Sequence, residues 1–306
     1  MLVRHMRYFA ALAREKHFSR AAKACNVSQP TLSGGIAALE EQLGVRLVIR
    51  GHRFVDLTAE GRVVLVWAHQ LVANEDNLRR GLEEMRSGLA GILRLGVIPA
   101  AMPAVGWITK AFCGAHPGVT VEIRSMSSMA IQMDLDSFDI DAGLTYLDNE
   151  PLEHVRRLAL YEESYLFATA ADGPLGSLNH INWSEAARQR LCLLSQEMQN
   201  RRILDAVLAA QGVHVTPSVV SNSYLGILSQ LRTGEWSSIV PHTFAYLFGG
   251  QPDIVLIPVV EPIHTQSVGL VTADRDPPPP MARALEVCAS NLVFAGKSGG
   301  KATPFR

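Results

Sequence analysis

The sequence predicts an α/β protein made of a small helical head, one long helix and a body of two α/β lobes. Three observations support this prediction. Residues 1–57 open with three short helical patterns, residues 58–90 hold a single long one, and strand and helix patterns alternate from residue 91 onwards. The length of 306 residues, with 48% hydrophobic and 19% charged residues, fits about two domains with large cores.

The N-terminal stretch lacks the pattern of a signal peptide, because Arg4, Arg7, Arg14 and Lys16 interrupt every apolar run. No stretch of the sequence reaches the roughly 18 uninterrupted apolar residues of a membrane span. We therefore expect a cytoplasmic protein without a membrane partner.

The four cysteines predict neither a disulfide framework nor a zinc site. Cys25, Cys113, Cys192 and Cys288 are far apart, and none belongs to a Cys-x-x-Cys pair or to a cluster with histidine. The spacing favours buried, reduced thiols, with a redox-switch pair of cysteines as the alternative. We expect no metal and no cofactor.

The net charge of −1 conceals an uneven distribution. Residues 1–57 hold nine Lys and Arg against four Asp and Glu, whereas the remainder holds 19 against 25. A basic head on an acidic body indicates that only the head meets a polyanion such as nucleic acid. A patch of this charge is also common on ordinary protein surfaces.

Three helices are expected in the head. Apolar residues at helical spacing predict the first over residues 2–13, and Ser19 is the expected N-cap of a short second helix over residues 20–25. After a tight turn, Ser28 is expected to cap the third helix. Pro30 then falls in the first turn, where the missing N–H costs little because those donors have no partner within the helix.

The third helix has two contrasting faces. One is an apolar stripe at steps of four, three and four, formed by Leu32, Ile36, Leu39 and Leu43. The other is small, polar and uncharged, and consists of Gln29, Thr31, Ser33, Gly34 and Ala37. Such a face suits bases, since Gln pairs with adenine, a Thr methyl contacts thymine and Ser reaches phosphate. A helix-turn-helix fits this pattern, and so does a chance helical hairpin.

The stretches "FSRAAKACNVSQPTLSGGIAALEEQLGVRLVIR" and "LTAEG" resemble the N-terminal winged helix-turn-helix of LysR-type transcriptional regulators. The matches keep fixed spacings from Phe18 to Gly61. The resemblance implies that residues 28–38 enter the major groove and that residues 47–55 form the wing, near backbone phosphate. The implied DNA-binding residues are Ser28, Gln29, Pro30, Thr31, Ser33, Gly34, Arg50 and Arg53.

Two departures from the family pattern concern packing and base reading. Val48 stands where the family usually has Phe, and Gly34 or Gly35 stands where it often has a long polar or basic residue. Each glycine costs about 1 kcal/mol of helix propensity relative to alanine. Either the apolar stripe holds the helix in spite of this cost, or the glycines let the helix lie closer to the bases.

The long helix, capped by Thr58 with Glu60 in its first turn, carries a heptad seam with one polar interruption at Glu75. Its members are Val64, Ala68, Leu71, Glu75, Leu78, Leu82, Met85 and Leu89. The resemblance implies a linker helix that pairs two subunits, and an exposed seam of this length favours a dimer. The alternative is a helix packed on its own domain.

The body is expected to form two lobes of parallel, doubly wound sheet. Strands are expected at residues 92–99, 119–123, 140–145, 161–168, 191–194, 217–220, 237–240, 254–257 and 265–273. Helices are expected at residues 103–115, 128–136, 198–211, 223–233 and 280–295. The strand at 161–168 begins the second lobe and the one at 265–273 returns to the first. Two crossings make a cleft like that of periplasmic solute-binding proteins, and the resemblance implies an effector-binding domain.

Ligands of such sheets lie outside the carboxyl ends of the strands, where helix N-termini favour a small anion or carboxylate. A solvated helix start is an alternative role for Arg201, and a satisfied loop histidine is one for His242. The loop at 99–103 lacks a hydroxyl group and offers only backbone N–H groups. The expected effector-binding residues are Ala100, Ala101, Met102, Ser125, Ser127, Thr145, Asn200, Arg201, Asn222, His242 and Ser267.

The segments "RLGVIPAAMPAV", "EIRSMSS" and "MQNRR" resemble a sub-branch associated with formate dehydrogenase genes, although no residue chemistry selects formate. The expected domains are a winged helix-turn-helix DNA-binding domain over 1–58, a dimerisation linker helix over 59–90, a periplasmic-binding-protein-like effector domain over 91–295 and a disordered tail over 296–306. Lobe I is expected over about 91–161 and 267–295, and lobe II over about 162–266.

The expected function is a transcriptional regulator that binds double-stranded, inverted-repeat promoter DNA as a dimer or tetramer, responds to a small metabolite and contacts RNA polymerase. A small-molecule-binding protein without a DNA function is one alternative, but it leaves residues 1–57 unexplained. An enzyme of two α/β lobes is another, but the sequence shows no phosphate-binding loop, nucleophile elbow or metal-ligand set.

Overall fold

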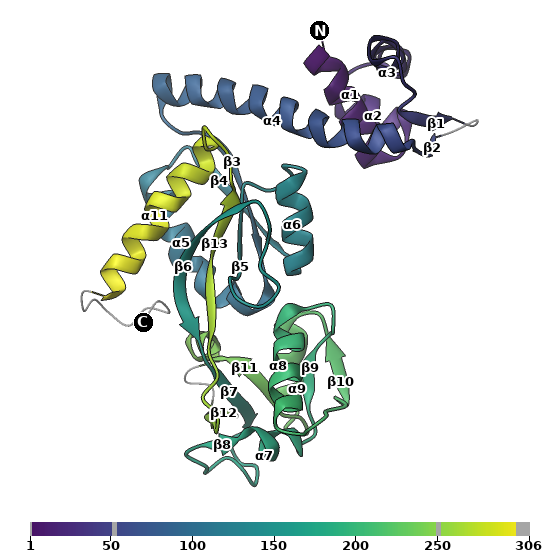
Figure 1. The fold of residues 1–306 in the computed structure, drawn as a ribbon. Helices are drawn as coiled ribbons and strands as arrows, with labels where there is room; N and C mark the ends of the chain where they lie inside the picture. The colour runs from purple at the N-terminus through teal and green to yellow at the C-terminus, as the bar shows by residue number, and fades with distance from the viewer. Residues whose placement is uncertain (1, 51–53, 249–251, 298–306) are drawn as a thin grey trace. The chain divides into compact units, whose positions relative to one another are not determined.

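The computed structural model describes residues 2–50, 54–248 and 252–297, and the chain forms two compact units (Figure 1). Unit 1 comprises residues 1–89 with 136–139, and unit 2 comprises residues 90–135 with 140–306. The head and the long helix belong to unit 1, and the two α/β lobes belong to unit 2. The predicted fold class is therefore confirmed.

Unit 1 combines a helical core with a β-hairpin. Its elements are α1 (Leu2–Glu15), α2 (Phe18–Ala24), α3 (Gln29–Leu43), β1 (Val48–Arg50), β2 (Phe54–Leu57) and α4 (Ala59–Ser87). The two strands pair antiparallel and form the predicted wing. Residues 51–53, between the strands, lie outside the described residues.

The apolar stripe of α3 holds this helix in the core of unit 1. Leu32, Ile36 and Leu39 are fully buried against Phe9 and Leu12 of α1. Burying each such side chain stabilises the fold by about 1.5–3 kcal/mol. The stripe therefore outweighs the helix-propensity cost of about 1 kcal/mol for each glycine. Leu43, the fourth predicted member, is instead 39% exposed, because it lies in the last turn before Gly44 ends the helix.

The two glycines of α3 have different surroundings. Gly35 is buried, and a Cβ atom added to it would lie 2.6 Å from Cδ2 of Tyr8, so α1 approaches α3 too closely for any side chain there. Gly34 is exposed, with nothing within 4 Å of an added Cβ. Gly35 is therefore required for packing within the head, whereas Gly34 leaves the exposed face of α3 without a protruding side chain at that position.

The predicted start of the second helix is wrong. The helix α2 begins at Phe18, and its N-cap residue, His17, makes no side-chain capping hydrogen bond. Ser19 therefore lies inside the helix, and its hydroxyl group is bonded to Gln29 of α3 instead. By contrast, Ser28 and Thr58 cap α3 and α4 as predicted.

Only part of the predicted seam on α4 is left exposed. Val64 and Ala68 pack against the core of unit 1, because this half of α4 lies on α1. Glu75 binds Arg7 of α1 and Arg79. Leu89 lies beyond the helix end. The apolar residues that stay exposed along the helix are Val63, Val66, Trp67, Leu71, Leu78, Leu82 and Met85.

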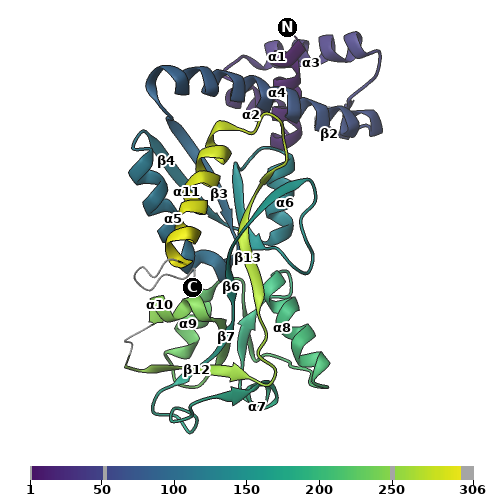
Figure 2. The ribbon, with the colours of Figure 1, turned by 60° about the vertical axis from the view of Figure 1, so that its left-hand side comes forward.

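The first lobe of unit 2 is a five-stranded sheet in the order β4-β3-β5-β13-β6 (Figures 1 and 2). Its strands are β3 (Gly91–Val97), β4 (Val119–Ser125), β5 (Ala142–Tyr146), β6 (Val155–Glu163) and β13 (Gln266–Ala273). The helices α5 (Met102–Ala115) and α11 (Pro280–Lys297) cover one face, and α6 (Ser128–Asp136) covers the other. The short helix η1 (Pro99–Ala101) precedes α5.

The second lobe contains a four-stranded sheet in the order β11-β7-β12-β8 and the pair β10-β9. Its strands are β7 (Tyr165–Ala170), β8 (Ile181–Asn182), β9 (Cys192–Leu194), β10 (Val219–Ser221), β11 (Ser238–Pro241) and β12 (Ile254–Val260). Its helices are α7 (Trp183–Ala187), α8 (Gln199–Ala210), α9 (Tyr224–Leu231), η2 (His242–Phe244) and α10 (Ala245–Phe248). The helices α8 and α9 pack on β9.

The sheets are mixed, and not parallel throughout as predicted. The strand β13 runs antiparallel to β5 and β6, and β7 runs antiparallel to β11 and β12. The predicted strand at 161–168 is in fact the end of β6 and the start of β7, separated by Ser164. The chain therefore enters the second lobe through one residue between two strands. The predicted tail is also too long, since α11 continues to Lys297; residues 298–306 lie outside the described residues.

His242 of η2 binds this crossing. The backbone N–H of Ser164 donates to Nδ1 of His242 at 3.1 Å, and the backbone N–H of His242 donates to the carbonyl oxygen of Ser164 at 2.8 Å. Burial lowers the pKa of His242, which keeps its ring neutral and able to accept this bond. The contacts of His242 therefore match the alternative role given above, that of a loop histidine whose hydrogen bonds are satisfied within the protein.

Candidate DNA-binding surface and effector cavity

The polar face of α3 is exposed on unit 1. Gln29, Pro30, Thr31 and Gly34 are exposed, and Ser33 is half-buried. Each predicted contact residue on the helix is therefore accessible. The face carries no charged side chain, so little hydration energy is lost when it is brought against another surface. A flat, uncharged helix face of this kind can approach the floor of a major groove closely.

Hydrogen bonds order the first turn of this face. The Ser28 hydroxyl oxygen accepts from the backbone N–H of Thr31 at 3.3 Å and lies 2.8 Å from Oγ1 of Thr31. Ser19 Oγ donates to Oε1 of Gln29 at 2.6 Å. This bond occupies the amide oxygen of Gln29 and leaves its Nε2 group to donate to another acceptor.

Glu40 connects α3 to the wing. It is 5% exposed, and its Oε1 accepts from the backbone N–H groups of Leu47 at 2.9 Å and Val48 at 3.2 Å. Its Oε2 lies 3.3 Å from Nη1 of Arg46. No role was expected of Glu40 from the sequence, although it lies within the stretch that resembles the family pattern. Arg50 lies in β1, with its side chain outside the described part of the chain, and Arg53 lies wholly outside it.

A small, narrow cavity lies between the two lobes of unit 2, and its empty space of about 210 Å³ includes open solvent. Its wall from the first lobe consists of Ile98, Pro99, Ala100, Ser127, Ser128 and Tyr146, and its wall from the second consists of Leu194, Met198, Gln199 and Asn200. Three expected effector residues, Ala100, Ser127 and Asn200, are thus brought together. None of the described lining residues is Lys, Arg or His.

Four further expected residues lie near this cavity without lining it. Ala101 ends η1 and is fully buried, and Met102 begins α5. Thr145 precedes Tyr146 on β5 and is fully buried. Ser125, at the end of β4, is exposed. The carboxyl ends of the strands therefore do meet at this edge of the sheet, but Tyr146 rather than Thr145 faces the cavity.

The remaining expected residues have other surroundings. Arg201 is 4% exposed, and its guanidinium donates to Asp205 Oδ1 at 2.8 Å and to the Leu194 carbonyl at 3.0 Å, so it is neither solvated nor part of the cavity wall. Asn222 is exposed after β10. Ser267 lies on β13, where its backbone N–H donates to Oδ2 of Asp148 at 3.1 Å.

The expected effector-binding residues do not include two polar groups of the cavity wall. Tyr146 and Gln199 adjoin the expected residues Thr145 and Asn200, and the alternation of β5 and the first turn of α8 turn them inward. Gln199 is 3% exposed, and its Oε1 has no hydrogen-bond partner among the described residues. A buried polar atom without a partner is costly, so Gln199 Oε1 can accept a bond from a bound molecule.

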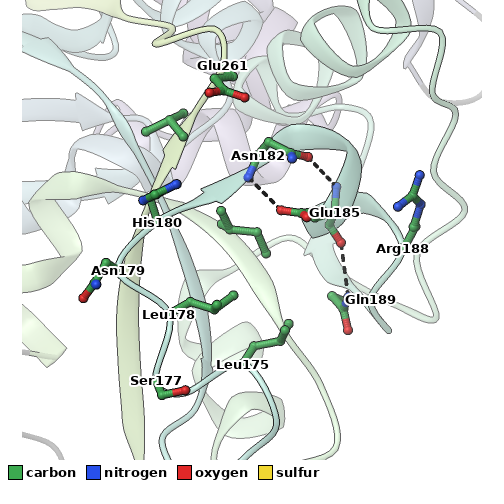
Figure 3. Close-up of a pocket in the computed structure, with 12 residues that line it drawn as sticks. Leu175, Ser177, Leu178, Asn179, His180, Asn182, Glu185, Arg188, Gln189 and Glu261 are labelled. Carbon is green, nitrogen blue, oxygen red and sulfur yellow. Dashed lines mark hydrogen bonds between the residues drawn. The ribbon is translucent and has the colours of Figure 1, made fainter.

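A second, open hollow of about 1270 Å³, open solvent included, lies on the second lobe beside α7 (Figure 3). Its polar groups include Asn182 and Glu185, whose side chains form the capping box of α7. None of the expected effector residues lines it.

The cysteines give no sign of a reactive thiolate. All four are free thiols, and burial raises the pKa of Cys25, Cys192 and Cys288. A raised pKa lowers the fraction of thiolate, the form that reacts with oxidants. In the part of the chain that the structure describes, no cluster of metal-ligating side chains occurs and no helix is long and apolar enough to span a membrane.

The head and the two-lobed body define the class of the protein, a transcriptional regulator with an effector-binding domain. Residues 3–62 match the family model of the bacterial regulatory helix-turn-helix protein, lysR family, and residues 86–291 match the LysR substrate binding domain. The chain therefore belongs to the LysR family.

Known relatives are similar over more than half of the chain. An uncharacterized HTH-type transcriptional regulator, YnfL of Escherichia coli K12, is 29% identical over 296 residues, which cover 95% of this chain and 98% of the relative. XapR of the same strain is 35% identical over 182 residues, which cover 58% of this chain and 60% of the relative.

Solved structures show the same fold. A full-length variant of OxyR from Pseudomonas aeruginosa aligns with a TM-score of 0.77 and 26% identity, over 95% of this chain and 94% of that one. CbnR in complex with its target DNA aligns with a TM-score of 0.65 and 20% identity, over 95% of this chain and all of that one (100%).

Proposed function

We propose that the head binds double-stranded, inverted-repeat promoter DNA, with the exposed face of α3 against base edges in the major groove. The observation that carries the proposal is this face itself, on which Gln29, Thr31 and Gly34 are exposed and uncharged. The excess of Lys and Arg over residues 1–57 supplies attraction to phosphate. The relative CbnR was solved with its target DNA, which supports the same role here.

Two copies of the chain pair through α4. Leu78, Leu82 and Met85 are 65%, 51% and 85% exposed, and a second copy of the same helix would bury them. A two-fold pair of heads matches two half-sites of an inverted repeat. Pairing of dimers into a tetramer extends the contact to a longer operator, where the regulator also reaches RNA polymerase. Residues 1–58, 59–90 and 91–295 then act as DNA-binding, pairing and effector domains.

The interlobe cavity binds a small metabolite, with a small anion or carboxylate as the proposed class. The cavity lacks a side-chain cation, so a carboxylate would be held by the hydroxyls of Ser127 and Ser128 and by N–H groups at the starts of α6 and α8. The N–H groups of Ala130, Arg201 and Arg202 do not take part, because they bond within these helix starts. The segments that resemble the formate dehydrogenase sub-branch make formate a compound to test. We assign this regulator to the cytoplasm.

The test of DNA binding uses the full-length protein and the DNA upstream of its own gene, at several salt concentrations. The affinity should fall steeply with salt, and Gln29→Ala with Thr31→Val should weaken binding and change the preferred sequence. Salt-independent binding, or an unchanged preference in the double variant, would contradict the proposal. A small-molecule-binding protein without a DNA function would instead gain thermal stability from a carboxylate while ignoring this DNA.

A further inference from the structure

A chain of hydrogen bonds crosses the wall of the interlobe cavity. Tyr224 of α9 donates through its hydroxyl group to Oδ1 of Asn200 at 3.0 Å, and Asn200 of α8 donates through Nδ2 to the hydroxyl oxygen of Tyr146 at 2.7 Å. Tyr146 of β5 in turn donates to Oε1 of Glu163, the last residue of β6, at 2.5 Å. Two members belong to each lobe, and the bond from Asn200 to Tyr146 joins the lobes.

Only the middle of this chain touches the cavity. Tyr146 and Asn200 line it, whereas Glu163 and Tyr224 stand behind them and are not among its lining residues. Both polar groups of the Asn200 side chain take part in this series of hydrogen bonds. The orientation of the side chain therefore depends on Tyr224 and Tyr146 together. Glu163 fixes the direction of the Tyr146 hydroxyl group, because it is the last acceptor in this series of hydrogen bonds.

The surroundings of Glu163 favour an uncharged carboxyl group. The residue is fully buried, and its Oε2 has no hydrogen-bond partner among the described residues. The titratable groups that face it are phenols, contributed by Tyr146 on β5, Tyr161 on β6, Tyr165 on β7 and Tyr224 on α9.

The nearest histidines do not supply a positive charge to this carboxyl. His242 of η2 packs edge-on against Tyr161, and His264 stacks on Tyr165. Burial lowers the pKa of both histidines. Burial disfavours the charged form of Glu163 as well, and for a carboxyl group this raises the pKa, here to about 8. The hydrogen bond from Tyr146 acts in the opposite direction.

We propose that Glu163 is a positioning residue of the effector cavity: as a neutral acid it ends the chain that orients Tyr146 and Asn200, and closure of the two lobes takes up one proton there. The inference rests on the proposed function of the cavity. When the lobes separate, water reaches Glu163, which then ionises near its ordinary pKa of about 4.3. Between about pH 4.3 and about pH 8 the closed form holds one more proton than the open form. The equilibrium therefore shifts from closed to open as the pH rises through this range, and it is constant above it.

The experiment measures amide hydrogen exchange of the full-length protein between pH 5 and pH 9, corrected for intrinsic chemical rates. In the wild type, opening of peptides covering residues 143–148 and 198–204 should increase by up to about tenfold per pH unit, the limit for one linked proton, and level off above pH 8. Glu163→Gln keeps an acceptor for Tyr146 and should remove this dependence. Glu162→Gln, at the exposed neighbouring position, should behave like the wild type.

A second variant keeps the proposal testable if Glu163→Gln does not fold. Tyr146→Phe removes the donor that favours ionised Glu163, so the upper end of the pH range should move to higher pH. Parallel pH profiles for the wild type and Glu163→Gln, or an unchanged range in Tyr146→Phe, would overturn the proposal. Promoter binding by the same proteins is scored separately, because its loss would count against the proposed function and not against the role of Glu163.

Discussion

The hydroxyl group of Ser19 on α2 donates a 2.6 Å hydrogen bond to the side-chain oxygen of Gln29 on α3. Both residues are exposed, so the bond lies on the surface that we propose faces DNA. It joins the two helices of the helix-turn-helix through the side chain expected to read a base. With Oε1 engaged, Gln29 presents Nε2 as a donor, which suits an acceptor such as purine N7.

Ser19→Ala should reduce sequence discrimination by about fivefold, the equivalent of one hydrogen bond of about 1 kcal/mol, because the Gln29 amide becomes free to rotate. The measurement is a binding selection on randomised operator DNA. Ser19→Thr retains the hydroxyl group and serves as the control. Equal discrimination by the Ala and Thr variants would show that Ser19 has no influence on base reading.

Gly35→Ala should destabilise the head by about 1–3 kcal/mol, since the new methyl group would meet the Tyr8 ring at 2.6 Å. Gly34→Ala, one residue away in open space, should leave the stability unchanged or raise it by up to about 1 kcal/mol. Urea unfolding followed by circular dichroism gives both values. Similar losses for the two variants would refute the assignment of different roles.

Glu40→Ala should cost about 1–3 kcal/mol, because the buried N–H groups of Leu47 and Val48 lose their acceptor. Glu40→Gln retains Oε1 and should recover most of that loss. Thermal unfolding measures the stability, and promoter affinity reports on the wing. If Gln proves as damaging as Ala, the carboxylate charge matters more than the two backbone bonds.

Leu78→Glu combined with Leu82→Glu should raise the dissociation constant of the dimer by at least about tenfold, since each buried leucine contributes about 1.5–3 kcal/mol. Val66→Glu changes an exposed apolar residue of the same helix outside the three- and four-residue spacing and is the matched control. Sedimentation velocity gives the association state. Unaltered association of the double variant would place the dimer contact elsewhere.

Local signals in the sequence located most elements because each signal has a direct physical cause. Ser28, Thr58 and the buried stripe of α3 act through neighbours in the same segment, and the structure agrees with them. The antiparallel course of β13 and the break at Ser164 depend on pairings between residues about a hundred apart, which strand patterns do not report.

The candidate sites show the same limit. The position of the cavity followed from the carboxyl ends of the strands, and Ala100, Ser127 and Asn200 do line it. Arg201 was expected there as an effector-binding side chain, but its guanidinium is held by Asp205 and a backbone carbonyl. Glu163 was overlooked, because the letters "YEESY" show an acidic strand end and give no sign that one of the two carboxyl groups is fully buried.

One of the two crossings between the lobes is a single residue, Ser164, and His242 binds both its backbone N–H and its carbonyl group. These two bonds resist rotation at Ser164, so movement of one lobe against the other should bend β6 and β7 where they meet this residue. The lobes should consequently separate through a small angle, which is enough for water to reach Glu163 and does not amount to a wide opening.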